Sequence, residues 1–211
     1  MKTYKIALPV LAIAGAAVSA NALVFDTGYE YTGGTNPAGT PPWNRVTITD
    51  VVPGTVTIKL ANINLVGTEF VSEASINFNP LKNVTSLTFG SPVSVGTFDL
   101  PSISKSANAY KAGGGGYYDI KFDFATANSK RFGVGESLTY TVSGIAGLMA
   151  SDFNFVSINA PTGVANAATA WHVQSIGPNG SQSGWVAPVP EPSAIFAVAL
   201  GSLVVLRRKR K

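Results

Sequence analysis

Alternation of polar and hydrophobic residues marks two neighbouring segments as β-strands. Residues 45–50 and 55–60 each alternate between a polar side chain and valine, isoleucine or leucine. Pro53 and Gly54 lie between them and favour a tight turn, so the two segments are predicted to form a hairpin. Further segments of strand-like composition follow at 75–79, 84–89, 96–100, 117–124, 137–142, 154–159 and 170–176. No part of residues 23–187 shows a sustained 3.6-residue period, which predicts an all-β fold.

The spacing of these segments indicates the kind of β-fold. Many of them start about ten residues apart, with Gly, Pro, Asn and Ser between them, which is typical of an antiparallel β-sandwich or jelly roll. Four alternate residues of segment 117–124 are hydrophobic and share one face: Tyr118, Ile120, Phe122 and Phe124. Lys121 and Asp123 occupy the other face. We expect the aromatic face to lie in the core.

The N-terminus has the three parts of a secretory signal peptide. Two lysines near the start precede an apolar stretch at residues 6–18, and small residues follow at Ala20 and Ala22. Cleavage after Ala22 would make residues 1–22 the signal peptide and start the mature chain at Leu23. The alternative is an N-terminal anchor that is not cleaved, although the apolar stretch is short for a membrane span.

The C-terminus has a second apolar stretch, at residues 194–206, between two distinctive flanks. A proline-rich segment precedes it: Val189, Pro190, Glu191 and Pro192. A basic tail closes the chain: Arg207, Arg208, Lys209, Arg210 and Lys211. As a helix, the apolar stretch would measure about 20 Å, against about 30 Å for the hydrocarbon core of a bilayer. The basic tail is expected to stay in the cytoplasm, which places the preceding residues outside.

This arrangement at residues 188–211 resembles the PEP-CTERM sorting signal. The resemblance implies an exosortase in the inner membrane that recognises the Pro-Glu-Pro segment and cleaves near it. The product would then leave the transient transmembrane helix for the cell surface or the extracellular matrix. Segments within residues 116–185 also resemble a recurring extracellular region that precedes such signals and has no assigned activity. The alternative is an ordinary single-pass anchor.

Charge and cysteine content remove several classes of function. The net charge of +4 comes from the two ends, because residues 23–187 carry 8 basic and 10 acidic side chains. No basic patch supports nucleic-acid binding. The chain has no cysteine, which excludes disulfides, thiolate metal sites and a cysteine nucleophile. We expect a Sec-exported β-sandwich-like extracellular domain at residues 23–187.

No catalytic, cofactor-binding or metal site is predicted. The one histidine, His172, has no recognisable nucleophile partner, and alternation along its strand turns it outward. The glycines at 113–116 are followed by a single nearby carboxylate, Asp119, so we expect a flexible hairpin loop and no calcium site. The remaining candidate carboxylates show no spacing that selects a catalytic pair: Asp99, Asp123, Glu136 and Asp152. We therefore expect a protein that is not an enzyme.

Three functions are compatible with these features. The favoured one is a structural surface or matrix protein that is associated with extracellular polysaccharide. The second is a secreted carbohydrate-binding module that stacks exposed aromatic rings on sugars, for which the three tryptophans are candidates: Trp43, Trp171 and Trp185. Trp43 follows Pro41 and Pro42 in a Gly-rich segment and is expected to be the most exposed. A secreted hydrolase is the least favoured.

Overall fold

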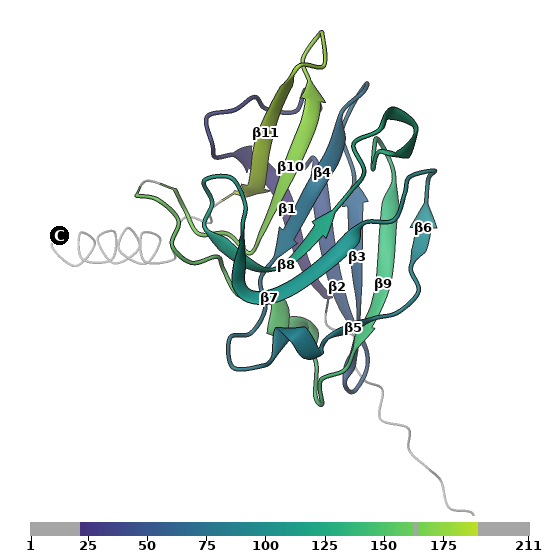
Figure 1. Cartoon of the computed structure of the whole chain (residues 1–211), viewed down its shortest axis with the longest axis vertical. Helices are drawn as coiled ribbons and strands as arrows, with labels where there is room; N and C mark the ends of the chain where they lie inside the picture. The colour runs from purple at the N-terminus through teal and green to yellow at the C-terminus, as the bar shows by residue number, and fades with distance from the viewer. Residues whose placement is uncertain (1–21, 163, 190–211) are drawn as a thin grey trace, which may run out of the picture.

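The computed structural model describes residues 22–162 and 164–189, which form a curled antiparallel sheet (Figure 1). Its strands are β1 (Ala22–Glu30), β2 (Asn44–Val52), β3 (Thr55–Asn62), β4 (Phe70–Ile76), β5 (Thr88–Phe89), β6 (Val93–Val95), β7 (Ser102–Lys111), β8 (Tyr117–Asp123), β9 (Ser137–Ser143), β10 (Thr169–Ile176) and β11 (Gln182–Pro188). Three short 3₁₀ helices lie in the connections: η1 (Val84–Ser86), η2 (Asn128–Lys130) and η3 (Ala150–Phe153).

The strand order is β5-β9-β3-β2-β1-β11-β10-β4-β8-β7, with β6 also paired to β9. Strand β1 joins the two halves of the sheet, because residues 22–26 pair with β2 and the later residues pair with β11. The curl brings the two ends of the sheet together. Lys105 on β7 donates hydrogen bonds to the main-chain oxygens of Thr85 and Leu87, which precede β5.

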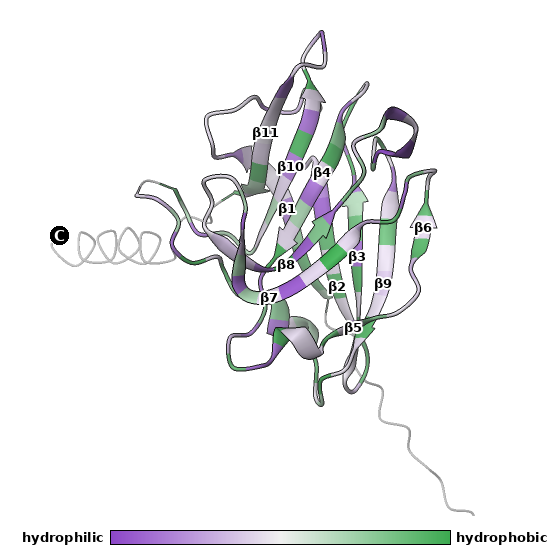
Figure 2. Ribbon diagram, viewed as in Figure 1, coloured by the Kyte–Doolittle hydropathy of each residue, from purple (hydrophilic) through white to green (hydrophobic). Residues whose placement is uncertain are grey.

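The main hydrophobic core lies between the two halves. In the predicted hairpin, Val46, Ile48 and Ile58 are fully buried, and residues of β4, β8 and β10 pack against them from the other half. Hydrophobic and polar positions alternate along β8 and β10 in Figure 2, as expected for strands with one face in a core. Phe124 and Phe132 stack in this core with ring centroids 4.5 Å apart.

A smaller hydrophobic cluster covers the opposite face of β10 and β11. Tyr31, Ala112, Tyr118, Ala170 and Ala187 form its buried part. The Tyr31 hydroxyl donates to the main-chain oxygen of Ala112 at 3.0 Å, which ties the glycine-rich turn between β7 and β8 to the end of β1. This turn is therefore packed against the sheet.

The structure confirms the all-β fold and several individual elements. The hairpin at 45–60 forms β2 and β3, with Val52 paired to Thr55 across the turn. Strands β8, β9 and β10 lie where the sequence predicts them. The four hydrophobic residues of segment 117–124 are all buried, and Lys121 and Asp123 form an ion pair of 2.8 Å on the other face.

Other strand predictions were wrong. Residues 96–100 and 154–159 form no strand, and residues 84–89 form η1 followed by the two-residue β5. The strand expected at 75–79 ends at Ile76, because Phe78 and Asn79 turn away to bind Asp119 and Asp152 through their main-chain N–H groups. Strands β1, β6, β7 and β11 were not predicted.

Within the part of the chain that the structure describes, no helix is long and apolar enough to cross a membrane. The apolar stretch at 194–206 lies outside the described residues, as does the signal-peptide stretch at 6–18.

Candidate functional site

The chain leaves the sheet directly at the start of the proline-rich segment. Strand β11 is an inner strand between β1 and β10, and its last residue, Pro188, is paired with Thr27. Val189 follows with 61% of its surface exposed. A Cβ atom at Gly28 would lie 3.2 Å from Cγ2 of Val189 and 3.5 Å from Cβ of Pro41, so Val189 still touches the fold. We call residues 188 and 189, together with Thr27 and Gly28 of β1 and the nearby Pro41, the sorting junction.

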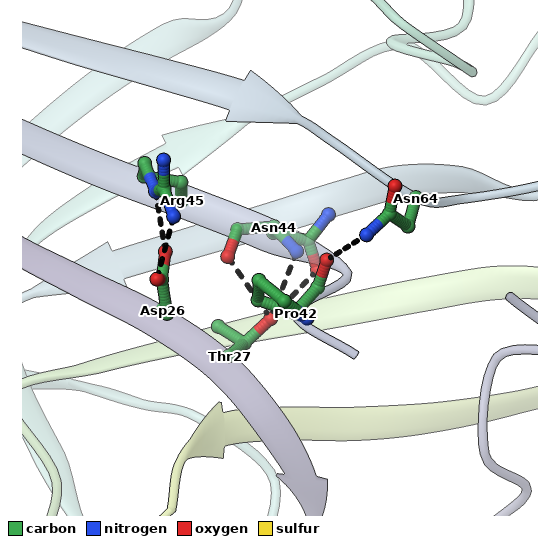
Figure 3. Close-up of polar contacts among 6 residues, drawn as sticks. All are labelled: Asp26, Thr27, Pro42, Asn44, Arg45 and Asn64. Carbon is green, nitrogen blue, oxygen red and sulfur yellow. Dashed lines mark hydrogen bonds and ion pairs between the residues drawn. The ribbon is translucent and has the colours of Figure 1, made fainter. Parts of the chain in front are cut away.

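A buried polar network holds β1 at this junction, and Figure 3 shows the part of it formed by Thr27 and Asn44. The Thr27 hydroxyl lies 3.2 Å from Oδ1 of Asn44, and the Asn44 main-chain N–H donates to the same hydroxyl at 3.1 Å. Asn44 Nδ2 donates to Oδ1 of Asn62 at 2.8 Å. Asn62 Nδ2 then donates to the main-chain oxygens of Phe132 and Gly133 at 3.0 and 2.7 Å. The network connects β1, β2 and β3 to the segment before β9.

The loop before β2 completes the junction. Pro41 and Pro42 are joined by a cis peptide bond, and Asn64 Nδ2 donates to the main-chain oxygen of Pro42 at 3.0 Å (Figure 3). The indole N–H of Trp43 donates to the main-chain oxygen of Gly39 at 2.6 Å. Trp43 is only 3% exposed and belongs to the main core. The expectation of an exposed Trp43 ring was wrong. The ring points into the core, and its hydrogen bond to Gly39 holds the loop before β2 over the ring.

One ion pair lies next to the network on the solvent side. Arg45 Nε and Nη2 donate to the two carboxylate oxygens of Asp26 at 2.5 and 2.7 Å. Both side chains are about two-fifths exposed. Asp26 and Arg45 are paired across β1 and β2, one position before the strand changes its partner from β2 to β11.

Two of the predicted site residues lie within the described part of the chain. Ala22 is the first residue of β1 and is paired with Thr49, so the predicted cleavage after Ala22 would leave Leu23 already inside the strand. Val189 lies at the sorting junction. The others lie outside the described residues: Ala20, Pro190, Glu191, Pro192, Arg207, Arg208, Lys209, Arg210 and Lys211.

The carboxylates considered for hydrolysis bind other groups of the fold. Asp99 pairs with Lys130 and Asp123 with Lys121, each at 2.8 Å. Asp152 accepts hydrogen bonds from Lys82, Asn79 and the main chain of Met149. Burial opposes ionisation of Asp152, but these hydrogen bonds outweigh it and hold its pKa below the usual value.

Two further carboxylates share one surface depression of about 650 Å³. Glu69, which sequence reasoning did not single out, accepts main-chain hydrogen bonds from Ala38 and Val66 at 2.7 and 2.9 Å. Glu136 accepts them from Gly133 and Thr97 at 2.7 and 2.9 Å. Since all four oxygens are hydrogen-bonded to the main chain, the pair is well suited to bracing loops.

His172 and Trp185 form a stacked pair of half-buried rings. The predicted orientation is confirmed, because Trp171 and Val173 are fully buried while His172 is half-buried on the other face. The His172 ring stacks on Trp185 with centroids 4.7 Å apart, and its Nδ1 lies 3.0 Å from the Ser72 hydroxyl. Burial lowers the pKa of His172. Trp171 is thus also excluded as a sugar-stacking ring.

The glycine-rich turn packs closely on Trp185. A Cβ atom at Gly113 would lie 2.7 Å from Cδ1 of the Trp185 ring, so the glycine permits this contact. No group of three or more metal-ligating side chains occurs among residues 22–162 and 164–189. The hairpin predicted at this position is confirmed, but its turn was expected to be a flexible loop, whereas Gly113 and Gly115 pack against Trp185 and Tyr31.

Comparison with known proteins identifies the class of the C-terminal segment. Residues 188–211 match the PEP-CTERM protein-sorting motif. This match confirms the resemblance noted in the sequence and supports an exported exosortase substrate that passes through the membrane during sorting. The match starts at Pro188, the last residue of β11, and covers no part of residues 23–187. No curated protein and no solved structure matches the chain.

Proposed function

We propose that this protein is a structural component of the cell surface or extracellular matrix, released there by an exosortase and associated with extracellular polysaccharide. The observation that carries the proposal is the position of the sorting motif. It starts at Pro188, where the sheet ends, so cleavage beyond Val189 leaves every strand in the product.

The junction limits where the exosortase can cut without damage to the fold. Strand β11 contributes hydrogen bonds to both β1 and β10, so a cut before Pro188 would remove residues of an inner strand. Only residues 189–193 separate the sheet from the apolar stretch at 194–206. Five residues span at most about 17 Å when fully extended. The enzyme therefore works within that distance of the folded domain, and Pro190 to Pro192 is the segment within its reach.

The β-domain itself supports a structural role. We infer that its two sheet halves act as a β-sandwich-like unit, which Sec-type machinery exports with removal of residues 1–22 as a signal peptide. Its net charge is small, and its candidate carboxylates are bound to other groups of the fold. A protein of this kind interacts with a polymer through hydrogen bonds and packing, with little long-range electrostatic steering. We propose that it is not an enzyme.

The proposal is tested by the intact mass of the protein recovered from the surface or medium of its native host. The expected product starts at Leu23 and ends between Val189 and Pro192. A variant with Pro190→Ala and Pro192→Ala should instead accumulate with its basic tail in the inner membrane. Pro178→Ala, an exposed proline in the β10–β11 turn, is the matched control and should be processed normally. A wild-type product that still ends at Lys211 and fractionates with the inner membrane would show that the tail is a plain anchor.

A further inference from the structure

A cavity of about 260 Å³ opens at the end of the sheet where β4 ends and β8 begins. Residues 77–84, which follow β4, form one side of it, and residues 155–158 form another, with Ala107 and Asn108 of β7 at the rim. None of the functional residues discussed above for sorting lies in this cavity. Its volume is below the roughly 300 Å³ at which pockets for drug-sized ligands begin, so it suits a single small ring.

A buried carboxylate supplies the polar side of the cavity. Asp119 is 6% exposed, its Oδ1 accepts the main-chain N–H of Asn108 at 2.6 Å, and its Oδ2 accepts that of Phe78 at 2.8 Å. A carboxylate has about four lone-pair positions, so each oxygen retains capacity for a second donor. Asn108 is exposed at the rim, with a backbone φ of 49°. Asn77 Nδ2 donates to Ala167, and its amide group adds to the polar lining.

Hydrophobic side chains supply the facing wall. Phe155 is half-buried beside Val156 and Ile158, which remain 54% and 42% exposed. Phe78 and Val84 are buried at the base. Exposed hydrophobic groups beside a buried hydrogen-bond acceptor indicate a ligand that is itself two-sided.

The charges in the cavity exclude anions. Lys82, the basic residue of the lining, is held by Asp152 at 2.5 Å and by the main-chain oxygen of Gly147 at 3.1 Å. Asp119 receives only neutral main-chain donors. The site therefore favours a ligand that donates hydrogen bonds and carries no negative charge, because an acidic ligand would face the Asp119 carboxylate without a free cation among the described residues beside it.

We propose that this cavity binds one neutral sugar ring, at a chain end or side branch of a polysaccharide. A pyranose has hydroxyl donors along its edge for Asp119 and Asn108, and a C–H face for Phe155 and its neighbours. The inference rests on the proposed polysaccharide association and names the site and the class of sugar. Uronic acids and other anionic residues are excluded by Asp119.

Saturation-transfer NMR tests this directly on the full chain, held in a detergent without a sugar headgroup. The probes are the methyl glycosides of glucose, galactose, mannose and N-acetylglucosamine, with methyl glucuronide as the anionic counterpart. At least one neutral glycoside should receive saturation, and the glucuronide should bind at least tenfold more weakly. Asn108→Gly and Phe155→Ala should each weaken the neutral glycoside at least tenfold.

The Asn108→Gly variant separates binding from folding, because glycine adopts a φ of 49° without strain. Asn159→Gly is the matched control, since Asn159 has a φ of 57° and lies outside the cavity lining. Transfer to none of the neutral glycosides, unchanged binding by Asn108→Gly, or preference for the glucuronide would each overturn the inference. If Asn108→Gly still co-sediments with host polysaccharide while no glycoside binds, the cavity assignment fails and the proposed association stands. If the wild type does not co-sediment with host polysaccharide, both the cavity assignment and the proposed polysaccharide association are wrong.

Discussion

Replacing Asn44 by alanine tests how the β-domain holds β1 beside the sorting junction. The substitution removes the hydrogen bond to Asn62 at 2.8 Å and the acceptor that lies 3.2 Å from the Thr27 hydroxyl. Oδ1 of Asn62 then remains buried without its donor, since Asn62 is only 3% exposed. An unsatisfied buried polar group costs about 1–3 kcal/mol, and the lost side-chain packing adds about 1 kcal/mol. We expect Asn44→Ala to lower the free energy of unfolding by about 2–4 kcal/mol.

The neighbouring ion pair provides a control on the same strand. Arg45→Ala removes the two hydrogen bonds to Asp26, at 2.5 and 2.7 Å. Both side chains are about two-fifths exposed, so solvent screens their attraction and can hydrate Asp26 after the change. Exposed pairs contribute about 0.2–1 kcal/mol. The Arg45–Asp26 contacts are therefore expected to contribute less to the free energy of unfolding than the buried Asn44–Asn62 hydrogen bond, although they are shorter.

Urea unfolding followed by tryptophan fluorescence measures both free energies. We expect the free energy of unfolding of Asn44→Ala to lie well below that of Arg45→Ala, and that of Arg45→Ala to lie within about 1 kcal/mol of the wild type. An Asn62→Ala variant and the double variant complete a cycle, in which the two asparagines should couple by about 0.5–3 kcal/mol. An Asn44→Ala loss below 1 kcal/mol, or one no larger than that of Arg45→Ala, would show that the network does not hold this part of the sheet.

Three further outcomes are expected. A chain that ends at Val189 should unfold at the same urea concentration as a longer one, whereas a chain that ends at Ser181 should show no cooperative transition, because it lacks an inner strand. Gly116→Ala should destabilise by about 2–4 kcal/mol in the same assay, because Gly116 has a φ of 93° and a Cβ atom there would lie 2.4 Å from the main-chain oxygen of Ile158. Burial lowers the pKa of His172 in the folded chain, so protonation of this histidine favours the unfolded chain. The free energy of unfolding should therefore decrease as the pH falls below about 6.5. His172→Gln should flatten that part of a stability–pH profile, and an unchanged profile would contradict the assignment.

The strands that were predicted are those whose pattern is set by one continuous hydrophobic face. The hairpin of β2 and β3 combines strict alternation with a Pro-Gly turn, and Gly54 adopts the φ of 82° that the turn requires. Strand β8 buries Tyr118, Ile120 and Phe122 on one face. In each case, local side-chain order and turn chemistry contain the information that the fold uses.

The missed strands lack such a face. Strand β1 changes its partner near Thr27 and has an irregular register between Thr27 and Tyr29, so its buried side does not repeat every second residue. Strand β7 lies at one end of the sheet order, and its sequence is dominated by Ser, Lys, Asn and Ala. Trp43 was misplaced for a related reason, because the surrounding prolines and glycines indicate a loop without showing where its ring packs.

The candidate sites also differ in how far the sequence predicts them, because one is formed by neighbouring residues and the other by residues far apart in the chain. The sorting motif is contiguous, so its residues could be identified from the sequence alone. The cavity is not contiguous, since Asp119 meets Phe78 and Asn108 only after β4, β7 and β8 have come together. Asp119 could be named as a carboxylate, but its binding partners lie 41 and 11 positions away along the chain.

The pairing of Thr27 with Pro188 joins the first strand of the domain to its last one. Strand β11 lies between β1 and β10 in the sheet, although β1 comes first in the chain and β11 comes last. During export, the sheet can therefore pair β1 with β10 through β11 only after nearly the whole chain has crossed the membrane. The sorting motif starts at the last residue of β11. A chain truncated before Gln182 lacks both β11 and the sorting motif. The strand that completes the sheet and the motif that directs sorting thus follow one another directly along the chain and share Pro188.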